Sequence, residues 1–220
     1  MRECHQAGAC HCLAEKGCGL IYLASRSPRR RELLAQIGVR FEALLFREGT
    51  RQDAETNEAV LPGEQADDYV RRVTRLKAQS AWERVTSRRG LQRKAVLAAD
   101  TTVALAGEIL AKPVDRDDAS RMLHLLSGTQ HRVLTAVAVV LEERLEMAVS
   151  ESLVTFAPLD EPRIAAYVHS GEPFDKAGGY GIQGRAGAFV ERLEGSYSGV
   201  MGLPLYETAT LLRLFGVMVP

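Results

Sequence analysis

Residues 21–34 read IYLASRSPRRRELL and combine three structural signals in a row. The opening apolar run is typical of a buried strand, and the closing leucines have helical spacing. Between them, Ser27 is a good N-cap, and Pro28 suits the first helical position because its missing N–H is not needed there. The stretch therefore predicts a strand, a tight turn and a helix N-terminus, whose free backbone N–H groups form a site for an anion.

Three arginines, Arg29 to Arg31, fall in the first turn of this predicted helix. A cation there opposes the helix dipole by roughly 0.3–1 kcal/mol, so a sequence shaped by stability alone would carry Asp or Glu instead. A bound anion that offsets this cost is the simplest explanation. On this stretch alone, three solvated surface arginines are the alternative.

The composition excludes several classes of partner. The chain has 220 residues, and its 28 Lys and Arg balance its 28 Asp and Glu. This balance does not favour nucleic acid or an anionic membrane, and no apolar run reaches the length of a membrane span. We therefore expect no nucleic-acid or membrane partner, and because no cysteine lies beyond residue 18, we expect a cytoplasmic protein. All four cysteines lie within residues 1–19, which we expect to be a disordered leader; a metal or redox role is the alternative.

The rest of the chain has the pattern of a mixed α/β protein. Periodicity predicts helices at residues 27–38, 67–88, 116–126 and 164–169, and strands at 39–46, 95–99, 131–141 and 145–156. The central strand, 95–99, is expected to end in Asp100-Thr101-Thr102, and residues 103–110 are expected to continue as strand, turn and strand. Because there is no internal repeat and no clear linker, we expect residues 20–220 to form a single domain with two lobes around a cleft.

Polar residues next to these elements are candidates for a ligand site. A carboxylate where a buried strand emerges is common at the ligand-binding edge of α/β sheets, which favours Asp100, although a helix or turn cap is the alternative. A turn at residues 106–107 would bring Lys112 back toward Asp100. Lys77 lies in the predicted helix 67–88, and from the residues alone a solvated helix lysine is the simpler interpretation.

Glycines crowd into residues 171–187, together with Gln183. Glycine lets the backbone approach a ligand closely. The Gln183 amide has donors and an acceptor, which suits it to reading the edge of a base. A flexible surface loop is the alternative, but Tyr180 and Ile182 give this segment side chains to bury.

These residue types suit chemistry on a nucleoside triphosphate, since phosphoryl and nucleotidyl transfer depend mainly on positioning and electrostatics. Arg29 and Arg30 offer fork-shaped donors to phosphate, and lysines offer point charges. Mg²⁺ or Mn²⁺ would need only one or two carboxylates. Asp100 has the chemistry either to bind that ion or to accept a proton from the attacking water.

A series of motifs resembles, in order, those of the Maf family of nucleoside triphosphate pyrophosphatases. They are SRSPRR at residues 25–30, ADT at 99–101, GEILAKP at 107–113, LSG at 126–128, DKAGGYGIQG at 175–184, GSY at 195–197 and GLP at 202–204. The resemblance runs from about residue 20 to the C-terminus. It implies a mixed α/β, Maf/ITPase-like fold with an elongated twisted sheet, flanking helices and two lobes around a cleft, often as a homodimer.

The resemblance also implies an activity and a site: hydrolysis of dTTP and UTP to the monophosphate and pyrophosphate with a divalent cation. It makes Asp100 the catalytic proton acceptor and a metal ligand. The residues it implies for substrate binding are Ser27, Arg29, Arg30, Lys77, Thr101, Lys112 and Gln183. Of these, Lys77 and Lys112 match phosphate-contacting positions, and the combination of Arg29, Thr101 and Gln183 matches the subgroup acting on dTTP and UTP.

The chain departs from the family pattern after the second strand. The acidic pair expected there is broken in Arg47-Glu48-Gly49-Thr50. Glu48 is the nearest candidate metal ligand, with Asp53 and Glu55 behind it. Two alternative functions stay open. One is a pyrophosphatase for modified nucleotides, such as 7-methyl-GTP, pseudo-UTP, 5-methyl-UTP or 5-methyl-CTP. The other is a non-catalytic regulator of septum formation, which only the broken acidic pair favours.

Overall fold

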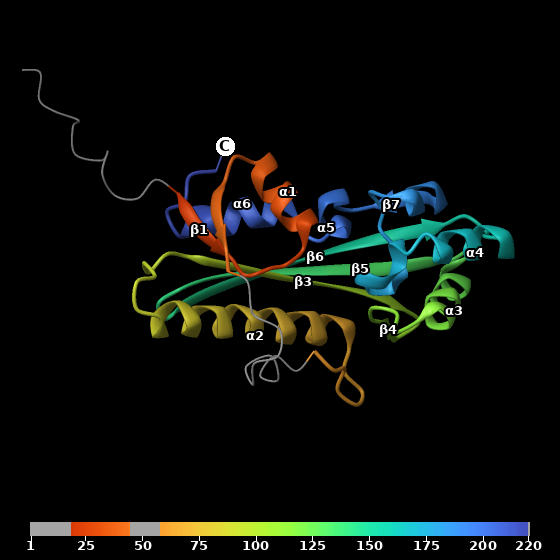
Figure 1. The fold of residues 1–220 in the computed structure, drawn as a ribbon, viewed down its shortest axis with the longest axis horizontal. Coiled ribbons are helices and arrows are strands. Elements are labelled where there is room, and N and C mark those ends of the chain that lie inside the picture. The colour runs from red at the N-terminus through yellow and green to blue at the C-terminus, as the bar shows by residue number, and fades with distance from the viewer. Residues whose placement is uncertain (1–18, 45–57, 220) are drawn as a thin grey trace, which may run out of the picture.

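The computed structural model describes residues 19–44 and 58–219, which are arranged along an elongated, twisted sheet (Figure 1). The strands are β1 (Leu20–Leu23), β2 (Arg40–Ala43), β3 (Val96–Leu105), β4 (Glu108–Leu110), β5 (Gln130–Leu141), β6 (Arg144–Phe156) and β7 (Val190–Glu194). The helices are α1 (Pro28–Gln36), α2 (Ala66–Ser87), α3 (Arg116–Leu126), α4 (Glu161–His169), α5 (Tyr197–Met201) and α6 (Leu205–Leu214). Short 3-10 turns follow α4 at η1 (Glu172–Asp175), η2 (Ala177–Gly179) and η3 (Arg185–Phe189).

The described strands form one mixed sheet in the order β2-β1-β3-β5-β6-β7, with β4 paired to β3. β1 runs parallel to β2 and β3, while β3, β5, β6 and β7 are joined by antiparallel pairing. The long strands β3, β5 and β6 extend through most of the molecule (Figure 1). The predicted mixed α/β fold with an elongated sheet and flanking helices is confirmed. The predicted leader at residues 1–19 lies almost entirely outside the described residues.

Helices cover both faces of the sheet, with α2 on one face and α1 and α6 on the other (Figure 1). Because side chains alternate along a strand, successive residues of β3 pack against different helices. Val96 and Ala98 pack with alanines of α2, whereas Leu97 and Ala99 pack with leucines of α1 and α6.

None of the helices in the described part of the chain has the length and hydropathy needed to cross a bilayer.

The sequence predicted that the central strand ends in residues 100–102 and that a strand resumes at Val103, but β3 runs without a break from Val96 to Leu105. Its pairing with β5 runs without a break through residues 100–102. On the opposite edge, however, the pairing with β1 stops at Leu97 and the pairing with β4 begins at Val103. The apolar run therefore ends not where the strand ends but where one edge of β3 loses its neighbouring strand. This interruption leaves space for a ligand beside Asp100.

An aromatic cluster anchors the glycine-rich segment to the far end of the sheet. The Phe156 ring is fully buried, and its centroid lies 5.1 Å from that of His131, 4.8 Å from that of Tyr180 and 6.1 Å from that of Phe189. Tyr180 and Ile182 are buried, as predicted. The segment that carries Gln183 is therefore packed against the core through its apolar side chains.

His131 in this cluster gives the protein a specific dependence on pH. Its side chain is buried, Nε2 lies 2.8 Å from the Tyr180 hydroxyl oxygen, and Nδ1 has no hydrogen-bond partner among the described residues. Burial lowers the pKa of His131 from 6.5 to about 4. Between these two values the unfolded chain binds a proton that the folded protein does not, so the free energy of unfolding falls as the pH falls.

We expect this histidine to remove about 3 kcal/mol of stability between pH 6.5 and pH 4, measured by urea unfolding at several pH values. His131→Gln keeps a polar side chain but has no group that titrates in this range. The variant should therefore lose most of this part of the slope. An identical slope in the two proteins would contradict the assignment of the pH dependence to His131.

Candidate active site

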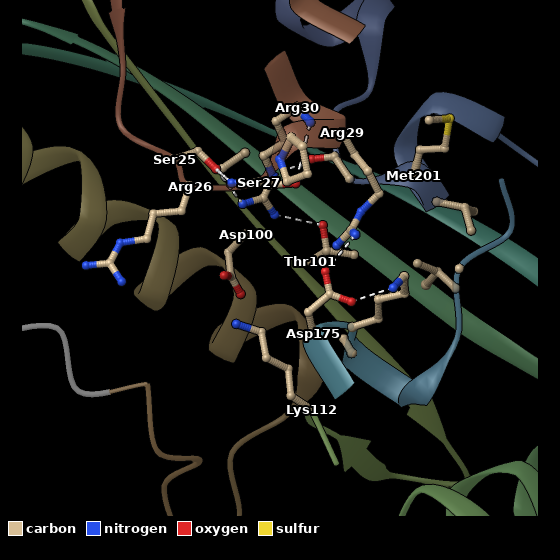
Figure 2. A pocket seen from close by; sticks show the side chains of 18 of the residues that line it. Ser25, Arg26, Ser27, Arg29, Arg30, Asp100, Thr101, Lys112, Asp175 and Met201 are labelled. Carbon is tan, nitrogen blue, oxygen red and sulfur yellow. Dashed lines mark hydrogen bonds and ion pairs between the residues drawn. The ribbon is translucent and has the colours of Figure 1, made fainter. Parts of the chain in front are cut away.

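A cavity of about 720 Å³ lies beside the uncovered edge of β3 (Figure 2). This volume is within the usual range for small-molecule sites. All predicted site residues in the described part of the chain line it: Ser27, Arg29, Arg30, Lys77, Asp100, Thr101, Lys112 and Gln183. Glu48, Asp53 and Glu55 lie outside the described residues, so the metal-binding role of Glu48 stays a prediction.

The N-terminus of α1 forms one wall of the cavity. Ser27 is the N-cap, as predicted, and its Oγ accepts a hydrogen bond from the Arg30 backbone N–H at 3.5 Å. The Ser25 Oγ accepts another from the Ser27 backbone N–H at 3.2 Å. No acidic residue lies in the first turn of α1. The turn therefore presents a positive helix end with no side-chain anion of its own to neutralise it.

Arg30 joins three separate segments of the chain. Its Nε donates to the Gly202 carbonyl oxygen at 2.7 Å, Nη2 to Thr101 Oγ1 at 3.2 Å and Nη1 to Ser25 Oγ at 3.4 Å. Burial lowers the pKa of the Arg30 guanidinium from its usual value, and the charge of Asp100 acts in the opposite direction. Besides its predicted role as a hydrogen-bond donor to phosphate, Arg30 thus holds the walls of the cavity together.

Lys77 lies between two carboxylates on the α2 side of the sheet. Its Nζ is 2.6 Å from Asp100 Oδ1 and 3.0 Å from Glu58 Oε1. Desolvation raises the pKa of Glu58, but the charge and hydrogen bond of Lys77, with Lys112 and Arg30, outweigh it and hold that pKa below its usual value. Glu58 is therefore an ionised member of the site. Glu58 was not among the predicted site residues, because it lies in a polar segment with no periodicity or motif.

This pair of carboxylates fits a divalent cation. Both are hard oxygen donors, and Asp100 and Glu58 contact the same nitrogen of Lys77, so the two carboxylates already face one shared positive charge. Within residues 19–44 and 58–219 there is no cluster of three or more His, Cys, Asp or Glu side chains that would hold a metal. The donor set therefore suits Mg²⁺ or Mn²⁺, which bind one or two carboxylates and complete their coordination with water and phosphate oxygens.

Across the mouth of the cavity, Asp175 links α1 to the glycine-rich segment. Arg29 Nη1 lies 2.9 Å from Asp175 Oδ2, and Lys176 Nζ contacts Asp175 Oδ1 (Figure 2). Desolvation raises the pKa of Asp175, but hydrogen bonds from Lys176 and Arg29 outweigh it, and that pKa is lower than usual. Arg29 and Lys176 therefore share one carboxylate. Gln183 lies at the same mouth and is exposed.

Gly178 brings this segment against β3. Its φ is +68°, and an added Cβ would lie 2.9 Å from the Cβ of Val103, which is buried. Gly178→Ala combines a left-handed backbone angle with overpacking, and we expect it to lower the free energy of unfolding by about 2–5 kcal/mol. Chemical denaturation measures this loss.

Gly107 provides the matched control for Gly178. Its φ is +88°, but nothing lies within 4 Å of an added Cβ. Gly107→Ala should therefore lose only about 1–2 kcal/mol, from the backbone angle alone. Equal losses in the two variants would show that the contact of Gly178 with Val103 is not tight.

The mixed sheet, the helix N-terminus facing the cavity and the lysine-bridged carboxylates define the chain as an α/β protein with a cleft suited to an anionic, phosphorylated ligand. Residues 20–215 match the family model described as Maf-like protein. The chain belongs to the Maf family.

Several relatives are similar to this chain over most of its length. A protein of Cupriavidus metallidurans named dTTP/UTP pyrophosphatase is 59% identical over 198 residues, which cover 90% of this chain and 98% of the relative. A protein of Ralstonia nicotianae with the same name is 61% identical over 193 residues, which cover 87% and 92%. Among solved structures, the Staphylococcus aureus Ham1 protein is similar with a TM-score of 0.35 and 14% identity, covering 62% of this chain and 70% of that one.

Proposed function

We propose that this chain is a nucleoside triphosphate pyrophosphatase that hydrolyses dTTP and UTP to the nucleoside monophosphate and pyrophosphate. The observation that carries the proposal is the meeting, in one cavity, of Asp100 paired with Lys77 and the open N-terminus of α1. Relatives that are 59% and 61% identical carry the name dTTP/UTP pyrophosphatase, which supports it.

The phosphates bind between α1 and the lysines. The α1 N-terminus and Ser27 offer backbone and hydroxyl donors, and Arg29 exchanges its contact with Asp175 for a phosphate oxygen. Lys112 extends toward Asp100 and has no ion-pair partner among the described residues (Figure 2). Its charge is available to an incoming phosphate.

Asp100 acts on the attacking water. Lys77 holds Asp100 Oδ1, which leaves Oδ2 to accept the proton as the water oxygen bonds to the α-phosphorus. The bond from the α-phosphorus to the bridging oxygen breaks, and pyrophosphate leaves with its electrons. The cations around the cavity stabilise the charge that develops on the phosphate oxygens.

Asp100 and Glu58 would hold the divalent cation, and Glu48 is a further proposed ligand. When bound, Mg²⁺ or Mn²⁺ would neutralise negative charge on the phosphates. Lys77 contacts both described carboxylates, so its positive charge offsets the electrostatic repulsion between them. We place the base toward Thr101 and Gln183, which line the same cavity as Arg29.

A panel of nucleotides tests the proposal. The purified chain is incubated with Mg²⁺ and each of dTTP, UTP, CTP, ATP, GTP, 7-methyl-GTP, pseudo-UTP and the 5-methylpyrimidine triphosphates, and pyrophosphate release is measured. We expect kcat/KM for dTTP and UTP to exceed that for the other unmodified nucleotides by about tenfold or more. A preference for a methylated purine would contradict the proposed substrate. No hydrolysis of any nucleotide would reject the enzyme and favour the non-catalytic regulator.

We further propose a homodimer, which the family resemblance implies, and a cytoplasmic location, which the lack of cysteine beyond residue 18 favours. Analytical ultracentrifugation of the full chain, at several concentrations and with and without Mg²⁺, tests the oligomeric state. A monomer at every concentration would contradict the dimer. Fractionation of cells producing the untagged chain tests its location.

A further inference from the structure

A chain of hydrogen bonds crosses the sheet behind the cavity. Thr101 of β3 lies directly opposite Thr135 of β5, and their Oγ1 atoms are 2.9 Å apart. Arg30 Nη2 lies 3.2 Å from Thr101 Oγ1 at one end of the chain, and at the other end Thr135 Oγ1 lies 2.8 Å from the Gly199 carbonyl oxygen. Thr135 is fully buried and is not part of the cavity lining, so it cannot touch a ligand there.

The two ends of this chain fix the direction of every hydrogen bond in it. A carbonyl oxygen only accepts, so the single hydroxyl hydrogen of Thr135 must go to Gly199. Thr135 then has no hydrogen left to donate, and Thr101 must donate its own to Thr135. A guanidinium only donates, so Arg30 takes up a lone pair of Thr101. The Thr101 hydroxyl is left with one lone pair and no hydrogen for a ligand.

Thr101 presents that lone pair at the cavity. Its side chain lines the cavity and, because successive side chains of a strand alternate, lies on the opposite face of β3 from Asp100. Gly202 lies next to it with a φ of +118°, and an added Cβ there would lie 3.5 Å from Thr101 Oγ1. The glycine therefore keeps side-chain atoms away from the hydroxyl. A ligand group beside Thr101 meets a hydrogen-bond acceptor.

We propose that Thr135 is a positioning residue which commits the Thr101 hydroxyl as an acceptor, so that the site favours the N3–H of uracil and thymine over cytosine. Uracil and thymine carry a donor at N3, whereas cytosine carries a bare nitrogen that only accepts. An acceptor facing cytosine N3 leaves two lone pairs opposed and unpaired, which a site built for hydrogen bonding rejects strongly. This inference rests on the proposed function, because it requires a pyrimidine base beside Thr101.

Thr135→Val is the direct test, since valine keeps the shape of threonine and removes its hydroxyl. The Thr101 hydrogen then loses its acceptor and is free to turn toward the cavity, where it can pair with cytosine N3. Gly199 keeps its other hydrogen bond, from the Gly202 backbone N–H at 2.9 Å, so its carbonyl oxygen is not left unpaired. We expect the ratio of kcat/KM for UTP to that for CTP to fall about tenfold, mainly through a lower KM for CTP.

Two controls separate this role from a structural one. Thr135→Ser restores the hydroxyl and should return the UTP to CTP ratio to that of the wild type. Thr74 of α2 is fully buried, and its hydroxyl has no hydrogen-bond partner among the described residues. Thr74→Val is therefore a matched removal of a buried hydroxyl, and it should leave the ratio unchanged.

The outcomes distinguish this inference from the proposed function. A wild type that hydrolyses no nucleotide rejects both. A wild type that prefers UTP, with the same UTP to CTP ratio in Thr135→Val, overturns only the role of Thr135. If Thr135→Val does not fold, Thr101→Val tests the same acceptor: kcat/KM should fall about tenfold more for UTP than for CTP, and equal losses would overturn the inference.

Discussion

Replacing Asp100 with asparagine is expected to lower kcat for dTTP and UTP by about 100- to 10,000-fold, the usual contribution of a general base. The asparagine carbonyl oxygen can still accept the hydrogen bond from Lys77 Nζ, which lies 2.6 Å from Asp100 Oδ1. An amide cannot take a proton from water, and its NH₂ group replaces the free carboxylate oxygen. The variant keeps the hydrogen bond to Lys77 but loses the proton acceptor and one charged ligand of the proposed cation, so at saturating Mg²⁺ we expect kcat to fall much more than KM changes.

The fold should survive this change. Lys77 keeps its ion pair with Glu58 at 3.0 Å, and the β3 ladder on either side of Asp100 is held by backbone hydrogen bonds with β5. Pyrophosphate release under saturating substrate and Mg²⁺ measures the effect on kcat, and thermal unfolding checks the fold.

Asp117 supplies a control with the same chemistry. It lies in the first turn of α3 and does not line the cavity. Asp117→Asn removes one carboxylate charge and should leave kcat unchanged. Full activity in Asp100→Asn would mean that another group accepts the proton, and it would remove the central step of the proposed mechanism.

The sequence predicted the elements of this fold well where burial and helical periodicity coincide. The α2 and α3 helices lie within a residue of their predicted bounds, because each has one apolar stripe and a polar remainder. The start of α1 was predictable for a local reason: a serine N-cap followed by proline depends only on neighbouring residues.

The site was predictable only in part, because some of its contacts join distant segments. The motifs identified Asp100 and Lys112, but no local pattern reveals that Glu58 reaches Lys77. The apolar run stops at residue 99, and periodicity reports burial, whereas β3 continues because its backbone pairs with β5. Thr135 lies in a run of β-branched residues and resembles any other strand residue until its partners are known.

Arg30 shows the same difference most clearly. The sequence predicts one role for it, as a hydrogen-bond donor to phosphate at the start of a helix, whereas the structure adds three hydrogen bonds to protein oxygens. One of them joins residues 172 positions apart in the chain. A residue that both binds substrate and holds three segments together should be sensitive even to a substitution that keeps its charge.

Arg30→Lys is expected to lower the free energy of unfolding by about 2–4 kcal/mol and kcat/KM for UTP by about 100-fold or more. A guanidinium sends donors in several directions at once, while an ammonium group is a single nitrogen that cannot reach Ser25, Thr101 and Gly202 together. The Gly202 carbonyl oxygen and the Thr101 hydroxyl then lose their donor, and α1 is no longer fixed to the α5–α6 connection. Urea unfolding and steady-state kinetics measure the two effects.

The neighbouring residue, Arg31, makes the comparison specific. Its Nη2 donates to the Arg26 carbonyl oxygen, and it does not line the cavity. Arg31→Lys is the same substitution one position along the same helix, and because the hydrogen bond of Arg31 to Arg26 is exposed, it should change the free energy of unfolding by no more than about 1 kcal/mol. If Arg30→Lys were as stable and active as Arg31→Lys, the positive charge alone would be sufficient at residue 30. The fork of hydrogen bonds would then not be what holds the walls of the cavity together.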